Sequence, residues 1–183
     1  MLKRWKRLKT TTLRKNPWWT YKLDAFRIPD GITGEYHYVH SNGSSMIVPV
    51  TDDGRIILVN QYRYLCDRES LEFPCGSVKD GSDYEETADV ELREETGFRA
   101  EKWDTLGEFN PYNGVTDEIC RIYIARGLTP VDSRPDATEE FELHRLTPEE
   151  ISARIADNTI WDGMTLAAWS LLTPALTDIP ARS

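Results

Sequence analysis

The chain has 183 residues, enough for one domain with its own hydrophobic core, and a second domain is not expected. No apolar run approaches the ~18–20 residues that span a bilayer, so we expect no membrane partner. The net charge of −9 is unevenly spread: the first fifteen residues carry seven Lys and Arg and no acid, and the rest carries 15 basic against 31 acidic residues. Because the body is acidic, we do not expect nucleic acid as a partner.

Residues 1–16 form a basic N-terminal arm ahead of the main domain, which we place at residues 17–183. Such an arm can bind RNA, acidic lipid or the acidic body, but the interpretation that we favour is a frayed, solvated terminus. The arm lacks the long apolar stretch of a secretory signal.

The three cysteines, Cys66, Cys75 and Cys120, are odd in number and scattered along the chain. This pattern argues against a disulfide framework and predicts a reducing, cytoplasmic location. We interpret Cys75 as a small apolar filler rather than a redox residue.

Apolar segments predict strands at residues 21–28, 35–40, 45–50, 55–62, 103–109, 118–125 and 139–146. Turn formers predict one hairpin across residues 29–31 and another across residues 51–54. The segment 55–62 is almost continuously apolar, which indicates a strand buried on both faces. Residues 110–117 are rich in turn formers and predict a loop.

Two C-terminal helices are predicted by their start signals. Thr147 can cap a helix that has Pro148 at its first position and Glu150 as the other half of a capping box. This helix runs to about residue 157. A second helix covers residues 162–172 and ends before Pro174.

A central helix is predicted between Ser82, which can cap it together with Glu85, and the stop signal Gly97. Its carboxylates Glu91, Glu94 and Glu95 are three and four residues apart, so they share one face. Like charges at this spacing repel, and a divalent metal would offset the repulsion. A solvated acidic face is the alternative, but a strand and a glycine-bearing loop precede the helix, an order that brings oxygen ligands for Mg²⁺ together.

The stretch from Gly76 to Phe98 resembles the Nudix box, G-x5-E-x7-R-E-U-x-E-E-x-G-U, where U is apolar. The alignment has no gap, and its matching positions are Gly76, Glu91-Leu92, Glu94-Glu95 and Gly97-Phe98. Two positions depart from the motif, because Ser82 replaces its first glutamate and Val90 its arginine. The flanking segments are similar to the ADP-ribose or ADP-sugar pyrophosphatase branch of Nudix hydrolases: Val48-Pro49-Val50, Asp53-Gly54, Gln61-Tyr62-Arg63 and Leu71 to Gly76.

This resemblance implies an α/β class chain with the Nudix fold, an α/β/α sandwich with a mixed sheet and N-terminal antiparallel strands. It implies Mg²⁺-dependent hydrolysis of a nucleoside diphosphate linked to X, most simply ADP-ribose or another ADP-sugar, giving AMP and a sugar phosphate. Mn²⁺ is an alternative metal. The expected partners are this small-molecule substrate and a second copy of the chain, because the branch commonly forms homodimers through N-terminal strands.

The resemblance also implies the site residues. Glu91 and Glu95 are the expected metal ligands, Glu94 a direct or water-mediated one, and the Cys75 carbonyl a further oxygen. The water is activated in this branch by a glutamate of a later loop, for which either Glu139 or Glu140 is the candidate. Residues expected at the substrate are Arg63, Glu72 and Gly76, and the aromatic candidates for stacking on it are Trp18, Trp19 and Tyr112.

Two further interpretations stay open. Val90 cannot hold Glu94 one turn away as the family's arginine can, so our hypothesis is that Ser82 and Val90 mark an ion pair lost as a unit. The same departures permit a nucleotide-binding domain without catalysis. Hydrolysis of another nucleotide sugar, such as a GDP-sugar, is a closer alternative, and decapping of nucleic acid is weaker because the body lacks a basic surface.

Overall fold

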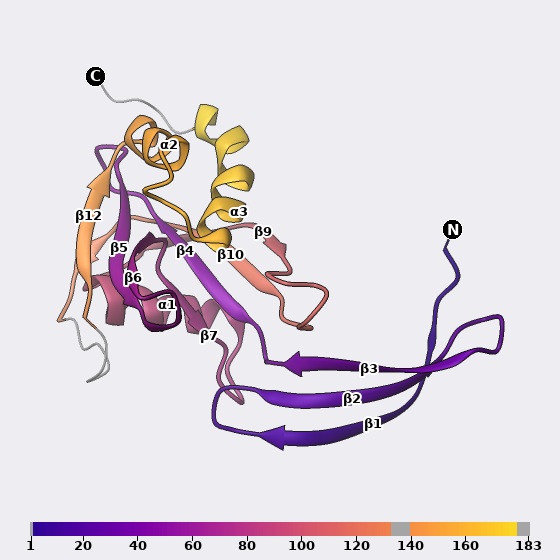
Figure 1. Cartoon of the computed structure of the whole chain (residues 1–183). Coiled ribbons are helices and arrows are strands. Elements are labelled where there is room, and N and C mark those ends of the chain that lie inside the picture. The colour runs from indigo at the N-terminus through magenta and orange to yellow at the C-terminus, as the bar shows by residue number, and fades with distance from the viewer. Residues whose placement is uncertain (1, 133–139, 179–183) are drawn as a thin grey trace. The chain divides into compact units, whose positions relative to one another are not determined.

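The computed structural model describes residues 2–132 and 140–178 (Figure 1). Within them the chain forms these elements in order: β1 (Lys6–Lys15), β2 (Thr20–Arg27), β3 (Thr33–His40), β4 (Ser44–Pro49), β5 (Ile56–Arg63), the 3-10 helix η1 (Tyr64–Cys66), β6 (Arg68–Glu72), β7 (Cys75–Ser77), α1 (Tyr84–Thr96), β8 (Phe98–Arg99), β9 (Lys102–Phe109), β10 (Cys120–Arg126), β11 (Thr129–Pro130), β12 (Glu142–Leu146), α2 (Pro148–Ala156), α3 (Gly163–Leu172) and the 3-10 helix η2 (Thr173–Asp178). None of the described helices is long and apolar enough to cross a membrane.

The chain divides into two compact units, which we call the N-terminal unit (Met1–Asn42 with Asn110–Ile119) and the body (Gly43–Phe109 with Cys120–Ser183). The N-terminal unit is an antiparallel sheet in the order β1-β2-β3. The expectation of a frayed N-terminus is therefore wrong. β-Branched Thr10, Thr11 and Thr12 favour an extended chain, and β1 forms a ladder with β2 from Lys6 opposite Arg27 to Lys15 opposite Thr20.

The predicted loop at residues 110–117 is confirmed, and it lies along β3. The Val39 amide donates to the Val115 carbonyl at 2.9 Å, and the Tyr36 hydroxyl donates to the Gly114 carbonyl at 3.1 Å. His40 Nδ1 lies 2.8 Å from a carboxylate oxygen of Asp117. These contacts explain why the loop belongs to the same unit as the three strands.

In the body, one sheet has the order β7-β4-β10-β9 and another the order β12-β5-β6. β4 and β10 are parallel, and the other pairs in these two sheets are antiparallel. The predicted hairpin of β4 with β5 is wrong, because only Val50 and Ile56 bridge across the turn. Both strands are apolar on both faces, so each gains more from two partners in a separate sheet than from the other across a tight turn.

Successive side chains of a strand point to opposite faces of the sheet, so the buried side chains of the body form two groups. Met46 and Val48 of β4 join the core beneath α2 and α3, whereas Ile47 between them packs with Ala88 and Leu92 of α1. The expected burial of β5 on both faces is confirmed, since its residues 56–59 are all fully buried. Helices therefore cover both faces of the strands, as the predicted α/β/α sandwich requires (Figure 1).

The helix starts agree with the sequence patterns except at α1. Thr147 and Glu150 form the predicted capping box of α2, and Asp162 caps α3. The capping box of α1 consists of Asp83 and Glu86, one residue after the predicted pair of Ser82 and Glu85. An aspartate adds a negative charge at the positive end of the helix, which serine does not supply.

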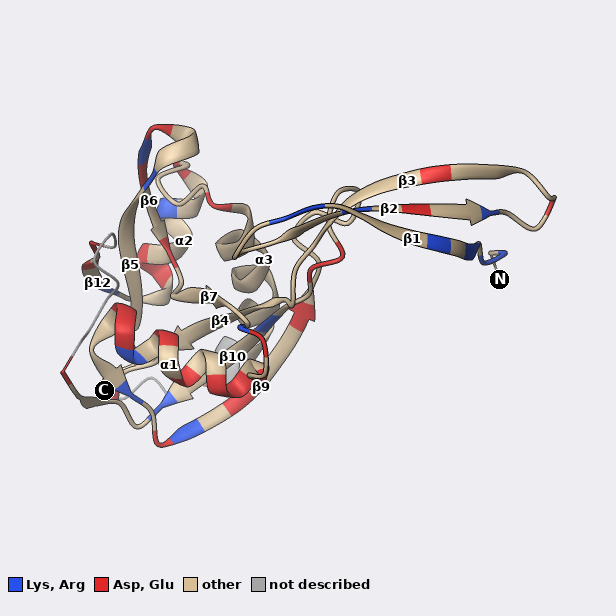
Figure 2. Ribbon diagram, turned by 90° about the horizontal axis from the view of Figure 1, so that it is seen from below, with Lys and Arg blue, Asp and Glu red and all other residues tan. Residues whose placement is uncertain are grey.

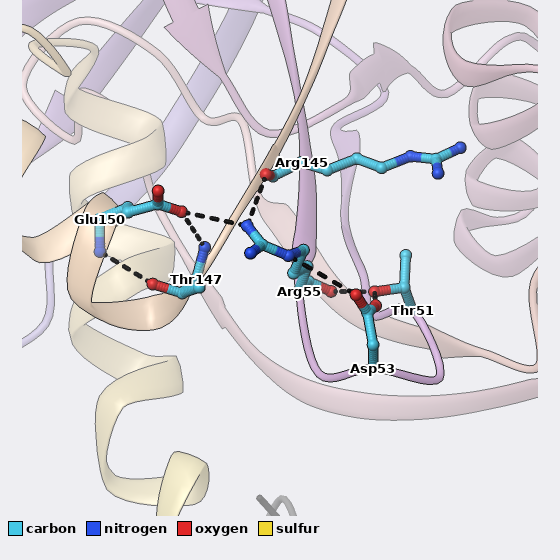
Figure 3. A network of polar contacts seen from close by, with 6 residues as sticks. All are labelled: Thr51, Asp53, Arg55, Arg145, Thr147 and Glu150. Atoms are coloured by element: carbon cyan, nitrogen blue, oxygen red, sulfur yellow. Dashed lines mark hydrogen bonds and ion pairs between the residues drawn. The ribbon is translucent and has the colours of Figure 1, made fainter. Parts of the chain in front are cut away.

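Arg55 connects the β4–β5 turn to the start of α2 (Figure 3). Its guanidinium donates at 3.3 Å to the Arg145 carbonyl and at 3.3 Å to the carboxylate of Glu150, the capping-box residue. On the turn itself, its Nε lies 3.5 Å from the carboxylate of Asp53. The network holds a surface turn against a helix cap and does not involve the acidic face of α1.

Candidate active site

The loop before α1 passes directly against Glu91. A Cβ atom placed on Gly76 would lie 2.0 Å from both Cδ and Oε1 of the Glu91 side chain. No residue larger than glycine fits there without displacing the carboxylate. Glycine is needed at the start of the motif because β7 passes close to the Glu91 side chain.

Glu95 reaches the same segment from one turn further along α1. Its side chain is 7% exposed, and its Oε2 accepts a hydrogen bond of 3.1 Å from the Cys75 amide. Glu91 and Glu95 thus both meet the Cys75–Gly76 backbone. The Cys75 side chain packs against the core beneath α2 and α3, as expected for an apolar filler.

The acidic face of α1 has oxygen donors of the type that a hard divalent cation takes. Figure 2 shows Asp and Glu along the helix. Its last-turn cation, Arg93, pairs with Asp89 at 3.0 Å, and Glu94 is half-buried. Across residues 2–132 and 140–178, no three His, Cys, Asp or Glu side chains lie close enough together to hold a metal ion.

Arg63 and Glu72, two residues predicted separately, form an ion pair with each other. Arg63 lies at the end of β5 and Glu72 at the end of β6, and their strands are antiparallel neighbours. Arg63 Nε donates to one carboxylate oxygen at 2.8 Å, and Nη2 binds the other oxygen. The hydrogen bond to Glu72 raises the pKa of Arg63 above its usual value. In the ladder Arg63 is opposite Arg68 and Glu72 is opposite Val59, so the pair is not a direct cross-strand pair and the sequence pattern did not indicate it.

The start of α3 supports this part of β6, a contact that sequence reasoning missed. The Phe73 amide donates to Thr165 Oγ1 at 3.2 Å, and Trp161 Nε1 donates to the Glu69 carbonyl at 3.1 Å. The Arg68 guanidinium lies 3.6 Å from the centre of the Trp161 ring. Only the predicted helix over residues 162–172 indicated that this segment was ordered, and no pattern in the sequence identified β6 as its partner.

The remaining predicted site residues lie in other parts of the chain. Glu140 is exposed and lies outside the helices and strands, and Glu139 lies outside the described residues. The stacking candidates Trp18, Trp19 and Tyr112 are 77%, 40% and 66% exposed and belong to the N-terminal unit. Their roles stay predictions.

Comparison with known proteins points to one family. Residues 41–167 match the profile of the NUDIX domain. The methanol dehydrogenase activator of Bacillus methanolicus is 32% identical over 149 residues, which cover 80% of each chain. The ADP-ribose pyrophosphatase of Bacillus subtilis is 29% identical over 148 residues, again 80% of each chain. An enzyme of the same name from Mycobacterium tuberculosis is 34% identical over 134 residues, 73% of this chain and 64% of that one.

A solved structure extends the comparison to the fold. The crystal structure of an ADP compounds hydrolase superposes with a TM-score of 0.86 and covers 100% of this chain and 99% of its own, at 22% sequence identity. Such a likeness establishes the architecture, including the strands of the N-terminal unit, and says nothing by itself about the substrate.

Proposed function

This chain belongs to the Nudix family of hydrolases, and from that premise we propose that it cleaves the diphosphate bond of ADP-ribose or another ADP-sugar, giving AMP and a sugar phosphate. Relatives named ADP-ribose pyrophosphatase, at 29% and 34% identity, support this substrate class. The observation that carries the proposal is the meeting of Glu91 and Glu95 with the Cys75–Gly76 backbone. A solvated acidic face would not require a glycine against one carboxylate or bury the other.

We propose Mg²⁺ as the metal, with Mn²⁺ as an alternative. Glu91 and Glu95 would hold it, Glu94 would contribute through water, and the Cys75 carbonyl would add an oxygen. When bound, such an ion offsets the negative charge of the diphosphate. All these donors are oxygens, which suits Mg²⁺ and Mn²⁺ better than softer metals.

The other roles follow from charge. Arg63 would bind the diphosphate, because a guanidinium can donate to two phosphate oxygens at once. Glu139 or Glu140 would take the proton from the attacking water. Gly76 would let the substrate and Glu91 approach the same backbone.

Substitution of Glu95 by Gln tests the proposal. We expect a loss of at least about 100-fold in kcat on ADP-ribose with Mg²⁺, because the amide replaces a charged ligand of nearly the same shape. Glu85→Gln is the matched control, since Glu85 is an exposed glutamate in the first turn of the same helix. It should retain the wild-type rate.

The substrate panel should include ADP-glucose, GDP-mannose, NADH and nucleoside triphosphates. Turnover of GDP-mannose ahead of all ADP compounds would assign the chain to another nucleotide sugar. No turnover of any compound, with nucleotide binding retained, would contradict the proposal and identify a binding domain.

We further propose that the protein is a homodimer in the cytoplasm. Large apolar side chains of the N-terminal unit are exposed, among them Trp5 at 57% and Ile32 at 65%, and a second copy would cover them. The three cysteines are odd in number and scattered along the chain, a pattern that favours a reducing compartment. Sedimentation of the purified protein should give twice the 21.1 kDa mass of the chain. A monomer at micromolar concentration would contradict the dimer.

A further inference from the structure

The hairpin of β5 and β6 holds the guanidinium of Arg63 against a carboxylate that solvent hardly reaches. The Glu72 side chain is 3% exposed, whereas the Arg63 side chain is 45% exposed. Both Glu72 oxygens accept from Arg63, one from Nε at 2.8 Å and one from Nη2. The pair is thus buried at its acidic end and open at its basic end.

This geometry leaves part of the arginine available. A guanidinium has five N–H donors in one plane, and Glu72 takes one from Nε and one from Nη2. The other three make no hydrogen bond with any residue in the described ranges. Because the first two bonds fix the plane, the direction in which these three donors point is fixed as well.

A buried carboxylate in this position is a poor ligand for the substrate itself. The diphosphate is an anion, and Glu72 would repel it if the two came into contact. Both carboxylate oxygens already accept charge-assisted hydrogen bonds from the guanidinium, and a cation bound to them would lie beside its positive charge.

The backbone between Glu72 and the α1 carboxylates is short and anchored. Phe73 is fully buried and its amide donates to Thr165 Oγ1, and two residues later the Cys75 amide donates to Glu95. Only two residues therefore lie between Glu72, whose carboxylate orients the arginine, and Cys75, whose amide binds Glu95.

We infer that Glu72 is a positioning residue, which orients Arg63 so that its outward N–H groups receive the diphosphate, and that Glu72 touches neither the substrate nor the metal. This inference rests on the proposed function. It assigns the two residues of the ion pair different roles: Arg63 binds the substrate, and Glu72 acts only through Arg63.

Steady-state kinetics on ADP-ribose across Glu72→Gln, Arg63→Lys and the double variant test the inference. Lys keeps a positive charge beside Glu72 but cannot form the two-pronged contact, so it avoids leaving a buried carboxylate unpaired. We expect Glu72→Gln to raise KM about tenfold, with kcat within about threefold and the Mg²⁺ concentration for half-activation unchanged. In the Arg63→Lys background the same change should have no further effect on KM.

Glu69→Gln is the matched control. Glu69 lies on the same strand, and its carboxylate accepts from the Asn60 side chain at 3.0 Å across the same two strands. Its KM should equal that of the wild type. If Glu72→Gln raised KM further in the Arg63→Lys background, Glu72 would act on the substrate itself and the inference would be overturned. A changed Mg²⁺ concentration for half-activation would overturn it by showing that Glu72 contacts the metal.

A second readout does not depend on turnover. The ¹⁵N NMR signal of Arg63 Nε–H should be resolved at neutral pH, should move when ADP is added, and should merge with the other arginine signals in Glu72→Gln. If no compound in the panel is hydrolysed but these changes occur, the proposed reaction fails and the positioning role stands. An Arg63 signal that ignores ADP, or that is unaffected by Glu72→Gln, would refute the positioning role.

Discussion

The N-terminal unit and the body are stabilised in different ways. Every buried apolar side chain among the described residues belongs to the body, and none belongs to the N-terminal unit, where Thr20 is the one buried residue. The three strands of that unit are held by their backbone ladders and by surface contacts such as the stacking of Trp5 on Phe26 at 4.5 Å. Hydrogen-bonded strands can thus be regular without a core, whereas the proposed site residues Arg63, Glu91 and Glu95 lie in the unit that has one.

The same substitution in each unit should measure this difference directly. Leu58→Ala removes a fully buried side chain from β5 and should lower the free energy of unfolding by about 2–5 kcal/mol. Leu8→Ala removes a side chain of β1 that is 44% exposed in the single chain and should lower the free energy of unfolding of the monomer by less than about 1 kcal/mol. Urea denaturation of both variants checks the values. A cost at Leu8 as large as that at Leu58 would mean that β1 is covered in solution.

Two glycines extend the comparison to activity. Gly76→Ala should reduce kcat about 100-fold, because the new methyl group displaces the Glu91 carboxylate by more than an ångström. Gly114→Ala in the N-terminal unit meets no atom within 4 Å and should leave kcat unchanged. Circular dichroism should show that both variants are folded. A fully active Gly76→Ala would contradict the placement of Glu91 in the site.

The cap of α1 gives a smaller effect. Asp83→Ala removes the side chain that accepts from the Glu86 amide at 2.8 Å and should lower the free energy of unfolding by about 1 kcal/mol. Ser82→Ala, one residue earlier, should change it by only a few tenths of a kcal/mol. Thermal unfolding of the two variants compares them. A larger loss of stability for Ser82→Ala than for Asp83→Ala would show that the helix begins at Ser82, as the sequence predicted.

The weakest expected effect is a pH dependence at the β4–β5 turn. The Thr51 hydroxyl donates to Asp53 and lowers the pKa of this exposed carboxyl below its usual 3.8. A lowered folded-state pKa contributes stability at pH values above the unfolded pKa, and this stability is lost as pH falls through the folded pKa. Asp53→Asn should therefore flatten the stability profile below about pH 4, measured by denaturation from pH 2 to 6. An unchanged slope would refute this.

Local sequence patterns predicted many of the secondary-structure elements of the body. The continuous apolar run predicted β5, the Thr-Pro-x-Glu order predicted the start of α2, and the glutamate spacing predicted that Glu91 and Glu95 would share one face of α1. These features depend on neighbours within one or two turns of chain. They can therefore be predicted from the sequence without knowledge of distant contacts.

Distant contacts decided what the sequence missed. β1 has no apolar period, and its order comes from pairing with β2. The turn at residues 51–54 reads as a hairpin, but the strands on either side take other partners. Ser82 with Glu85 and Asp83 with Glu86 both satisfy the capping pattern, so residue types alone could not choose between them. The pairing of Arg63 with Glu72 likewise depends on strand register.

The parallel ladder of β4 and β10 has a consequence for the folding rate. It joins Ser44 to Cys120 and Ser45 to Arg121, so the body's central pair forms only after a long segment has closed into a loop. Closure of this kind slows folding relative to a helical bundle of similar size. Until β10 pairs with it, the apolar strand β4 has no partner on that side, and unpaired apolar strands of this kind favour aggregation.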